Sequence, residues 1–164
     1  MFEGIVSQKW ADAEIERLLD TSSPLLDRLT KFYQDIVGRR SKQGVRLFMR
    51  AGLDDQQLAA RYTYPLNEHV LTPVITALRK EAGLAQPIEK PVLRAECELV
   101  MMLHGALAHI GMRKHIYDSP LPDDLGELVA FNVECFLEGA VAINLFNPCI
   151  FCLPAVLNVF ECWN

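Results

Sequence analysis

Apolar residues recur every three to four positions along most of the chain, a spacing that predicts one buried face on an α-helix. In the opening segment Phe2, Val6 and Trp10 already share such a face. Sustained alternation of apolar and polar residues, the pattern of a β-strand, does not occur in the sequence. We therefore predict an all-α fold with about seven helices. They lie at about 2–18, 24–38, 41–53, 54–61, 65–82, 91–117 and 122–141.

Prolines and glycines predict where these helices begin, bend and end. Pro24 stands at the expected first turn of the second helix, where a missing N–H costs nothing. Pro73 lies inside the helical pattern of 65–82, so we expect it to bend that helix or to break it in two. Gly83 directly follows the same pattern and predicts a helix end with left-handed backbone.

The composition is that of an ordinary soluble domain. The chain has 164 residues, of which 51% are hydrophobic and 23% charged. A net charge of −5 argues against these residues forming a nucleic-acid surface, because phosphate binding needs a basic excess. No signal peptide is visible, and no segment approaches the roughly 20 apolar residues that span a bilayer. Five cysteines without framework spacing favour a reducing cytoplasm.

Histidine and cysteine are the residues with the chemistry for a metal site, and their spacing argues against one. His104 and His115 return to nearly the same helix face but about 16 Å apart along the axis, too far for one ion. Cys149 and Cys152 have the CxxC spacing, but no second such pair completes a zinc ribbon. No hydrolase, Walker or dinucleotide-binding motif occurs. We therefore expect no enzyme activity, metal or cofactor; a small helical enzyme or metal protein using His104 and the cysteine pair is an alternative.

Small and apolar residues mark the inner faces expected for the last two helices. Gly105, Ala106 and Gly111 lie in one helix, and Gly139 and Ala140 lie in the other. Such residues allow helices to approach closely. Two helices joined by a short loop cannot bury both of their sides alone, so pairing with a second copy would form a four-helix interface.

Three stretches carry a resemblance to a known family. They are FEGIVSQKW, GVRLFMRAGLDDQQLAARYTYPLNEHVLTPVITALRKEAG and ELVMMLHGALAHIGMRKHIYDSPLPDDLGELVAFNVECFLEGA. The first resembles the helix that follows the recognition helix in tetracycline-repressor-like (TetR family) transcriptional regulators. The second resembles the middle of the effector domain in one subgroup of that family. The third resembles the last two helices, which form the dimer interface there, and the whole resemblance covers roughly residues 2–142.

The resemblance implies a cytoplasmic, homodimeric repressor without membrane association, in which 1–142 form the effector-binding and dimerisation domain. DNA would be contacted only by a helix-turn-helix expected before Phe2. The effector is expected to be a small apolar molecule. By position, the implied pocket is lined by Trp10, Phe32, Tyr33, Phe48, Met49, Tyr64, Met101 and His104. The implied dimer contacts are Leu107, Gly111, Leu128, Asn132, Cys135, Phe136 and Gly139.

Two alternatives remain open. The aromatic residues of the earlier helices suit an apolar pocket, but they equally suit an ordinary core. A stand-alone helical interaction protein that forms heterodimers with intact regulators would use the same interface and need no ligand. The segment 143–164, with three cysteines and one charged residue, matches nothing expected after the last family helix. We interpret it as a foreign or frame-shifted tail, or alternatively as a short hydrophobic element.

Overall fold

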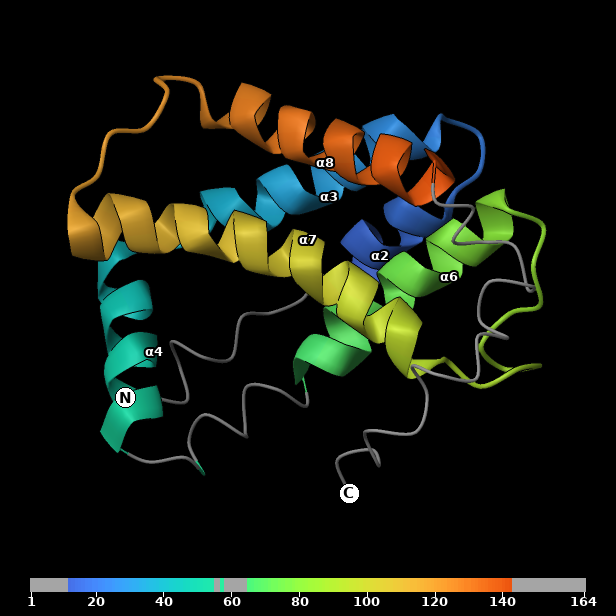
Figure 1. Cartoon of the computed structure of the whole chain (residues 1–164), viewed down its shortest axis with the longest axis horizontal. Coiled ribbons are helices and arrows are strands. Elements are labelled where there is room, and N and C mark those ends of the chain that lie inside the picture. Colours follow the sequence, from blue (N-terminus) through green and yellow to red (C-terminus); the bar gives the residue numbers. More distant parts are fainter. Residues whose placement is uncertain (1–11, 55–56, 58–64, 143–164) are drawn as a thin grey trace.

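The structure, a computed structural model of the chain, describes residues 12–54, 57 and 65–142 (Figure 1). These residues form six α-helices and two short π-helical segments, and they contain no strand, which confirms the all-α prediction. The elements are α2 Asp12–Leu19, α3 Leu25–Gly38, α4 Lys42–Asp54, η1 Asn67–Leu71, α6 Thr72–Glu81, α7 Arg94–Met112, η2 Arg113–Tyr117 and α8 Leu125–Ala142. The start of the predicted opening helix and most of the helix predicted at 54–61 lie outside the described residues. None of the helices described here is long and apolar enough to cross a membrane.

Helix α3 lies at the centre of the described bundle. It contacts α2, α6, α7 and α8, and Figure 1 shows α7 and α8 in front of it. Its buried side includes Leu29, Phe32 and Ile36, as the spacing predicts. The core continues through Val70, Val74 and Leu78, through Val100, Leu103 and Leu107 of α7, and through Val129 and Val133 of α8. Each such side chain contributes about 1.5–3 kcal/mol of burial energy.

Pro73 interrupts the regular helix, as predicted, but the chain stays helical on both sides of it. The residues before Thr72 form the π-helical segment η1, in which the Thr72 amide bonds to the Asn67 carbonyl. Proline has no N–H to donate to the carbonyl four residues earlier, and its ring crowds that carbonyl. One wide turn ahead of the proline relieves this crowding, after which α6 continues to Glu81.

Gly83 ends α6 in the left-handed conformation predicted for it. Its φ is 65°. The Gly83 amide bonds to the Lys80 carbonyl at 3.2 Å and the Leu84 amide to the Arg79 carbonyl at 2.8 Å. These two bonds form a Schellman motif, which satisfies carbonyls that the end of a helix leaves unpaired.

Gly83→Ala is expected to lower the stability of the chain by about 1 kcal/mol, because a Cβ disfavours the left-handed region. This corresponds to a fall of roughly 2–4 °C in Tm. Gly38→Ala is the matched control, since Gly38 ends α3 without a positive φ and an added Cβ there would meet nothing within 4 Å. Thermal unfolding of both variants checks the expectation, which would be wrong if they behaved alike.

A buried arginine holds the connection between α6 and α7. Arg79 is 3% exposed and donates two hydrogen bonds to the Glu96 carboxylate, at 2.6 and 2.8 Å. Its remaining donors reach the carbonyls of Ala85, Lys90 and Pro91 at 3.1, 2.7 and 3.0 Å. The connecting loop is therefore fixed through its backbone by one side chain of α6.

Candidate functional site

The structure brings Tyr33 of α3 and His104 of α7 together in the interior. Their ring centroids lie 6.2 Å apart and the rings are tilted by 48°. Tyr33 is fully buried and His104 is 4% exposed. Neither the Tyr33 hydroxyl nor His104 Nδ1 has a hydrogen-bond partner among the residues that the structure describes. A buried polar atom without a partner costs about 1–3 kcal/mol, so two neighbouring ones mark a site that needs an explanation.

Helical spacing places both side chains in the core. Tyr33 follows Leu29 by four residues on α3, and His104 lies four after Val100 and three before Leu107 on α7. Positions three and four apart share a helix face, so the apolar neighbours bury the polar residue with them. The polar pair is thus built into the amphipathic pattern of two helices.

Burial also sets the protonation of the pair. It lowers the pKa of His104 to about 4, and the positive charge of Arg40 acts in the same direction. Burial raises the pKa of the Tyr33 hydroxyl, an effect that Arg40 partly opposes. At neutral pH the imidazole is therefore uncharged and the phenol keeps its proton. Arg40 itself is anchored, because its Nη1 donates to the Ala108 carbonyl at 3.3 Å.

The other residues predicted to line a ligand pocket are dispersed. Phe32 packs edge-on against Tyr33, at 5.5 Å between centroids, and also lines a separate surface cleft. Phe48 and Met49 are half-buried on α4, and Met101 is 37% exposed on α7. Trp10 and Tyr64 lie outside the described residues. Among the residues predicted to line the pocket, Tyr33 and His104 contact each other in the core, whereas Met101 lies at the surface.

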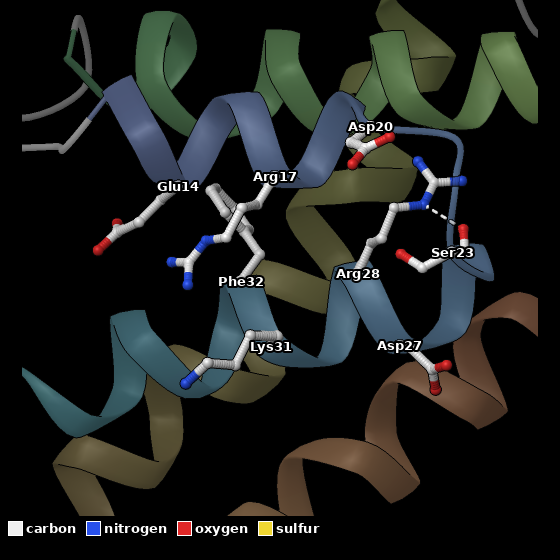
Figure 2. A pocket seen from close by; sticks show the side chains of 8 residues that line it. All are labelled: Glu14, Arg17, Asp20, Ser23, Asp27, Arg28, Lys31 and Phe32. Atoms are coloured by element: carbon white, nitrogen blue, oxygen red, sulfur yellow. Dashed lines mark hydrogen bonds between the residues drawn. The ribbon is translucent and has the colours of Figure 1, made fainter.

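A cleft of about 190 Å³ lies between α2 and α3 (Figure 2). Its walls carry acidic and basic side chains, and its basic side chains already have partners within the chain. Arg28 donates to the carbonyls of Ser23 and Leu18 and to Glu81, while Arg17 and Lys31 both bond to Asp35. The Arg17–Asp35 ion pair and the hydrogen bond from Arg28 to the Leu18 carbonyl join α2 to α3. The basic side chains of the cleft therefore serve the packing of the two helices.

Exposed uncharged side chains lie along α7 and α8, which contact each other, with the exposed Glu134 and Glu138 beside them on α8. We call this surface the α7–α8 face and define it as Met102, Gly105, Ala106 and His109 of α7 with Phe131, Cys135 and Gly139 of α8. Met102 is 73% and Phe131 62% exposed. Met102 is followed at three, four and seven residues by the others of α7, and the residues of α8 are four apart, so each set lies on one side of its helix. A Cβ added at Gly105 or Gly139 would meet nothing within 4 Å.

The residues predicted for a dimer interface fall into two groups. Cys135 and Gly139 are exposed on the α7–α8 face, and Leu128, Asn132 and Phe136 are half-buried beside it. Leu107 is 1% exposed within the core. Gly111 is buried against α4, where an added Cβ would lie 3.3 Å from Val45 Cγ2. The structure thus places Leu107 and Gly111 inside the protomer, so they do not belong to the surface open to a second copy.

Sequence reasoning missed Met102 and Phe131, the two large exposed side chains of this face. Their helical positions could have indicated the face, because each of the two side chains lies on the side opposite the buried residues of its helix. Helix α8 is apolar around much of its circumference, however, and periodicity alone does not show which side meets the core.

Among the residues that the structure describes, no group of three histidine, cysteine or acidic side chains is placed to hold a metal ion. Cys149 and Cys152 lie outside the described residues. Comparisons of the chain with known protein families, with curated proteins and with solved structures found no match.

Proposed function

We propose that the chain is the ligand-binding and dimerisation domain of a TetR-like transcriptional regulator. The observation that carries the proposal is the α7–α8 face, because large apolar side chains are exposed there on the helices that the resemblance assigns to dimerisation. Met102 and Phe131 belong to neighbouring helices that contact each other. Large apolar side chains exposed on adjoining helices favour a contact with another macromolecule.

The partner we propose for this face is a second copy of the chain. Two antiparallel helices joined by a short connection present a surface that a two-fold axis can pair with itself, giving a four-helix contact. The face combines bulky side chains, Met102 and Phe131, with the small residues Gly105, Ala106 and Gly139. Bulky groups of one copy can fill the space over small groups of the other, which permits close helix packing.

Ligand sensing is the second half of the proposal, and the Tyr33–His104 pair supports it. A ligand bound against both rings would contact α3 and α7 together. Because α7 also carries the dimer face, a ligand that favours one position of α7 would bias the geometry of the dimer. The bias is limited to the difference in its affinity for the two arrangements.

Phe131→Glu is expected to convert a dimer into a monomer. In a two-fold interface the substitution acts twice and places two charges in an apolar contact, so we expect the dimer to weaken by roughly 100-fold or more. Sedimentation equilibrium at micromolar concentrations measures the mass of both proteins. Leu53→Glu is the control, since Leu53 is 85% exposed on α4, away from this face.

A monomeric wild-type chain, or a Phe131→Glu variant that remains dimeric, would refute the proposed interface. A dimer that binds no apolar probe would instead favour the stand-alone interaction protein, which uses the same face without a ligand.

A further inference from the structure

We infer that the corner where α4 meets η2 binds the phosphate backbone of a nucleic-acid duplex without reading its sequence. The inference goes beyond the proposed function, which places DNA contacts in a segment before Phe2, and it depends neither on a ligand nor on a dimer. Five cationic side chains lie at this corner. We call them the basic corner, and they are Arg40 just before α4, Lys42 and Arg46 in α4, and Arg113 and Lys114 in η2.

The fold brings the two segments of the basic corner together. Helix α4 contacts η2 and α7, and Figure 1 shows it projecting from the other helices at that end of α7. His115 Nε2 lies 3.3 Å from the Arg40 carbonyl oxygen, which joins η2 to the residue that leads into α4. Lys42 and Arg46 are exposed on one side of α4, about 6 Å apart along its axis, and Lys114 is exposed on η2.

No carboxylate of the described residues pairs with the charges of the basic corner. Lys42, Arg46 and Lys114 belong to none of the ion pairs that the described residues form. Arg40 and Arg113 donate to main-chain carbonyls, which carry no net charge. The corner therefore presents positive charge that its own surroundings do not neutralise.

Most other described lysines and arginines are paired with a carboxylate. The pairs are Arg17–Asp35, Arg28–Glu81, Lys31–Asp35, Arg39–Glu14, Arg50–Asp54, Arg79–Glu96 and Arg94–Glu98. Outside the basic corner, Lys80 and Lys90 are the described cations without such a pair. The chain thus gathers most of its uncompensated positive charge in one place.

The net charge of −5 is an average over the whole chain and does not set the field at this corner. At physiological ionic strength, mobile ions screen an exposed charge over about 8 Å. A phosphate at the basic corner is therefore affected mainly by the five cations there and by Asp118, the acidic residue that directly follows η2. The local balance is positive, so it outweighs the expectation drawn from the net charge.

The shape of the basic corner favours a nucleic-acid backbone over an acidic peptide. A peptide gains most of its affinity from apolar side chains seated in a pocket, whereas phosphate contacts need only accessible positive charge. The exposed Lys42 and Arg46 stand on a projecting helix. A duplex carries one phosphate for about every 3.4 Å of axis on each strand, so side chains about 6 Å apart reach different phosphates. Such contacts carry no sequence information.

The test measures binding of the full chain to a short labelled DNA duplex of arbitrary sequence by fluorescence anisotropy at increasing salt. With about three to four phosphates neutralised, the wild-type affinity is expected to fall roughly 40–150-fold between about 50 and 200 mM salt. A variant that combines Lys42→Gln, Arg46→Gln and Lys114→Gln is expected to bind roughly tenfold more weakly, or worse, at the lower salt. Each substitution alone should reduce the slope of log K against log salt by about one.

Lys90→Gln is the matched control, because Lys90 is exposed and unpaired in the loop after α6 and its substitution changes the net charge equally. Thermal unfolding checks that all variants are folded. A wild-type chain that does not bind the duplex at about 50 mM salt, or a Lys90→Gln variant that loses as much affinity as Lys42→Gln, would overturn the inference. Displacement of the duplex by polyglutamate as readily as by unlabelled duplex would also overturn it, in favour of an acidic protein partner. None of these results bears on the dimer, which is tested by Phe131→Glu.

Discussion

Replacing Arg79 with methionine is expected to lower the free energy of unfolding by about 3–5 kcal/mol, the usual effect of removing one partner from a buried ion pair. The variant leaves the Glu96 carboxylate, which is itself mostly buried, without its cation. It also leaves the carbonyls of Ala85, Lys90 and Pro91 without the donor that now reaches them. Since a domain is stable by only about 5–15 kcal/mol, this is a large share of the total.

Urea unfolding measures this loss. The protein concentration is kept the same for all variants, because the stability of a dimer depends on it. Arg50→Met is the matched control. Arg50 pairs with Asp54 at 3.4 Å, but the two side chains are 82% and 67% exposed. Exposed pairs of this kind contribute about 0.5 kcal/mol or less. Similar losses in the two variants would show that Arg79 does not hold the α6–α7 connection.

Acidification is expected to destabilise the wild-type chain through His104. The folded pKa of this histidine is about 4, below the ordinary value of 6.5, so between those values the unfolded chain binds more protons than the folded one. Its contribution to stability is fully present above about pH 6.5 and is lost as the pH falls toward 4. Between pH 7 and 4.5 the loss is about 2.5 kcal/mol, at 1.36 kcal/mol for each pKa unit.

His104→Leu should remove this pH dependence, because leucine fills a similar volume and does not titrate. Urea unfolding of both proteins at intervals from pH 7 to 4.5 measures it. Burial opposes ionisation of Glu96, but hydrogen bonds from Arg79 and from the Leu93 amide outweigh that effect and hold its pKa below the ordinary 4.5. The stability that Glu96 contributes is therefore lost at a pH below 4.5. Parallel pH profiles for the two proteins between 7 and 4.5 would refute the assignment to His104.

Much of the described fold was predictable from the spacing of apolar residues. The helices at 24–38 and 41–53 appear within about one residue of their predicted limits. In the pattern at 65–82, the apolar residues spaced by four, Leu66, Val70, Val74 and Leu78, are all buried. Pro73 and Gly83 acted as their backbone chemistry predicts. These features depend on local geometry, for which sequence spacing is sufficient information. The π-helical form of η1 was not predicted, because a wide turn is one of several ways to relieve a proline.

The site was less predictable because it depends on which helix packs against which. Both Tyr33 and His104 were expected in a pocket, but their pairing arises from the contact of α3 with α7, which lie far apart in sequence. Gly111 was expected to contact a second copy, yet α4 covers it within the protomer. A glycine on a helix allows another element to approach closely, and only the tertiary structure shows whether one does and which one it is. Tyr33 and His104 remain predictions as ligand residues until a probe is bound.

Arg79 binds the loop after α6 only through main-chain carbonyls. Within the loop, Glu89 accepts a hydrogen bond from the Gln86 amide, and the Gln86 side chain donates to the Leu84 carbonyl. Ile88 in that loop is 96% exposed. Because carbonyl groups are common to all residues, the contacts with Arg79 depend on the length of the loop and leave an exposed position such as Ile88 free to vary. In relatives of this chain we expect residue identities there to drift, while the arginine and its glutamate change only together. A substitution at Ile88 would then be tolerated, and a single inserted residue would not.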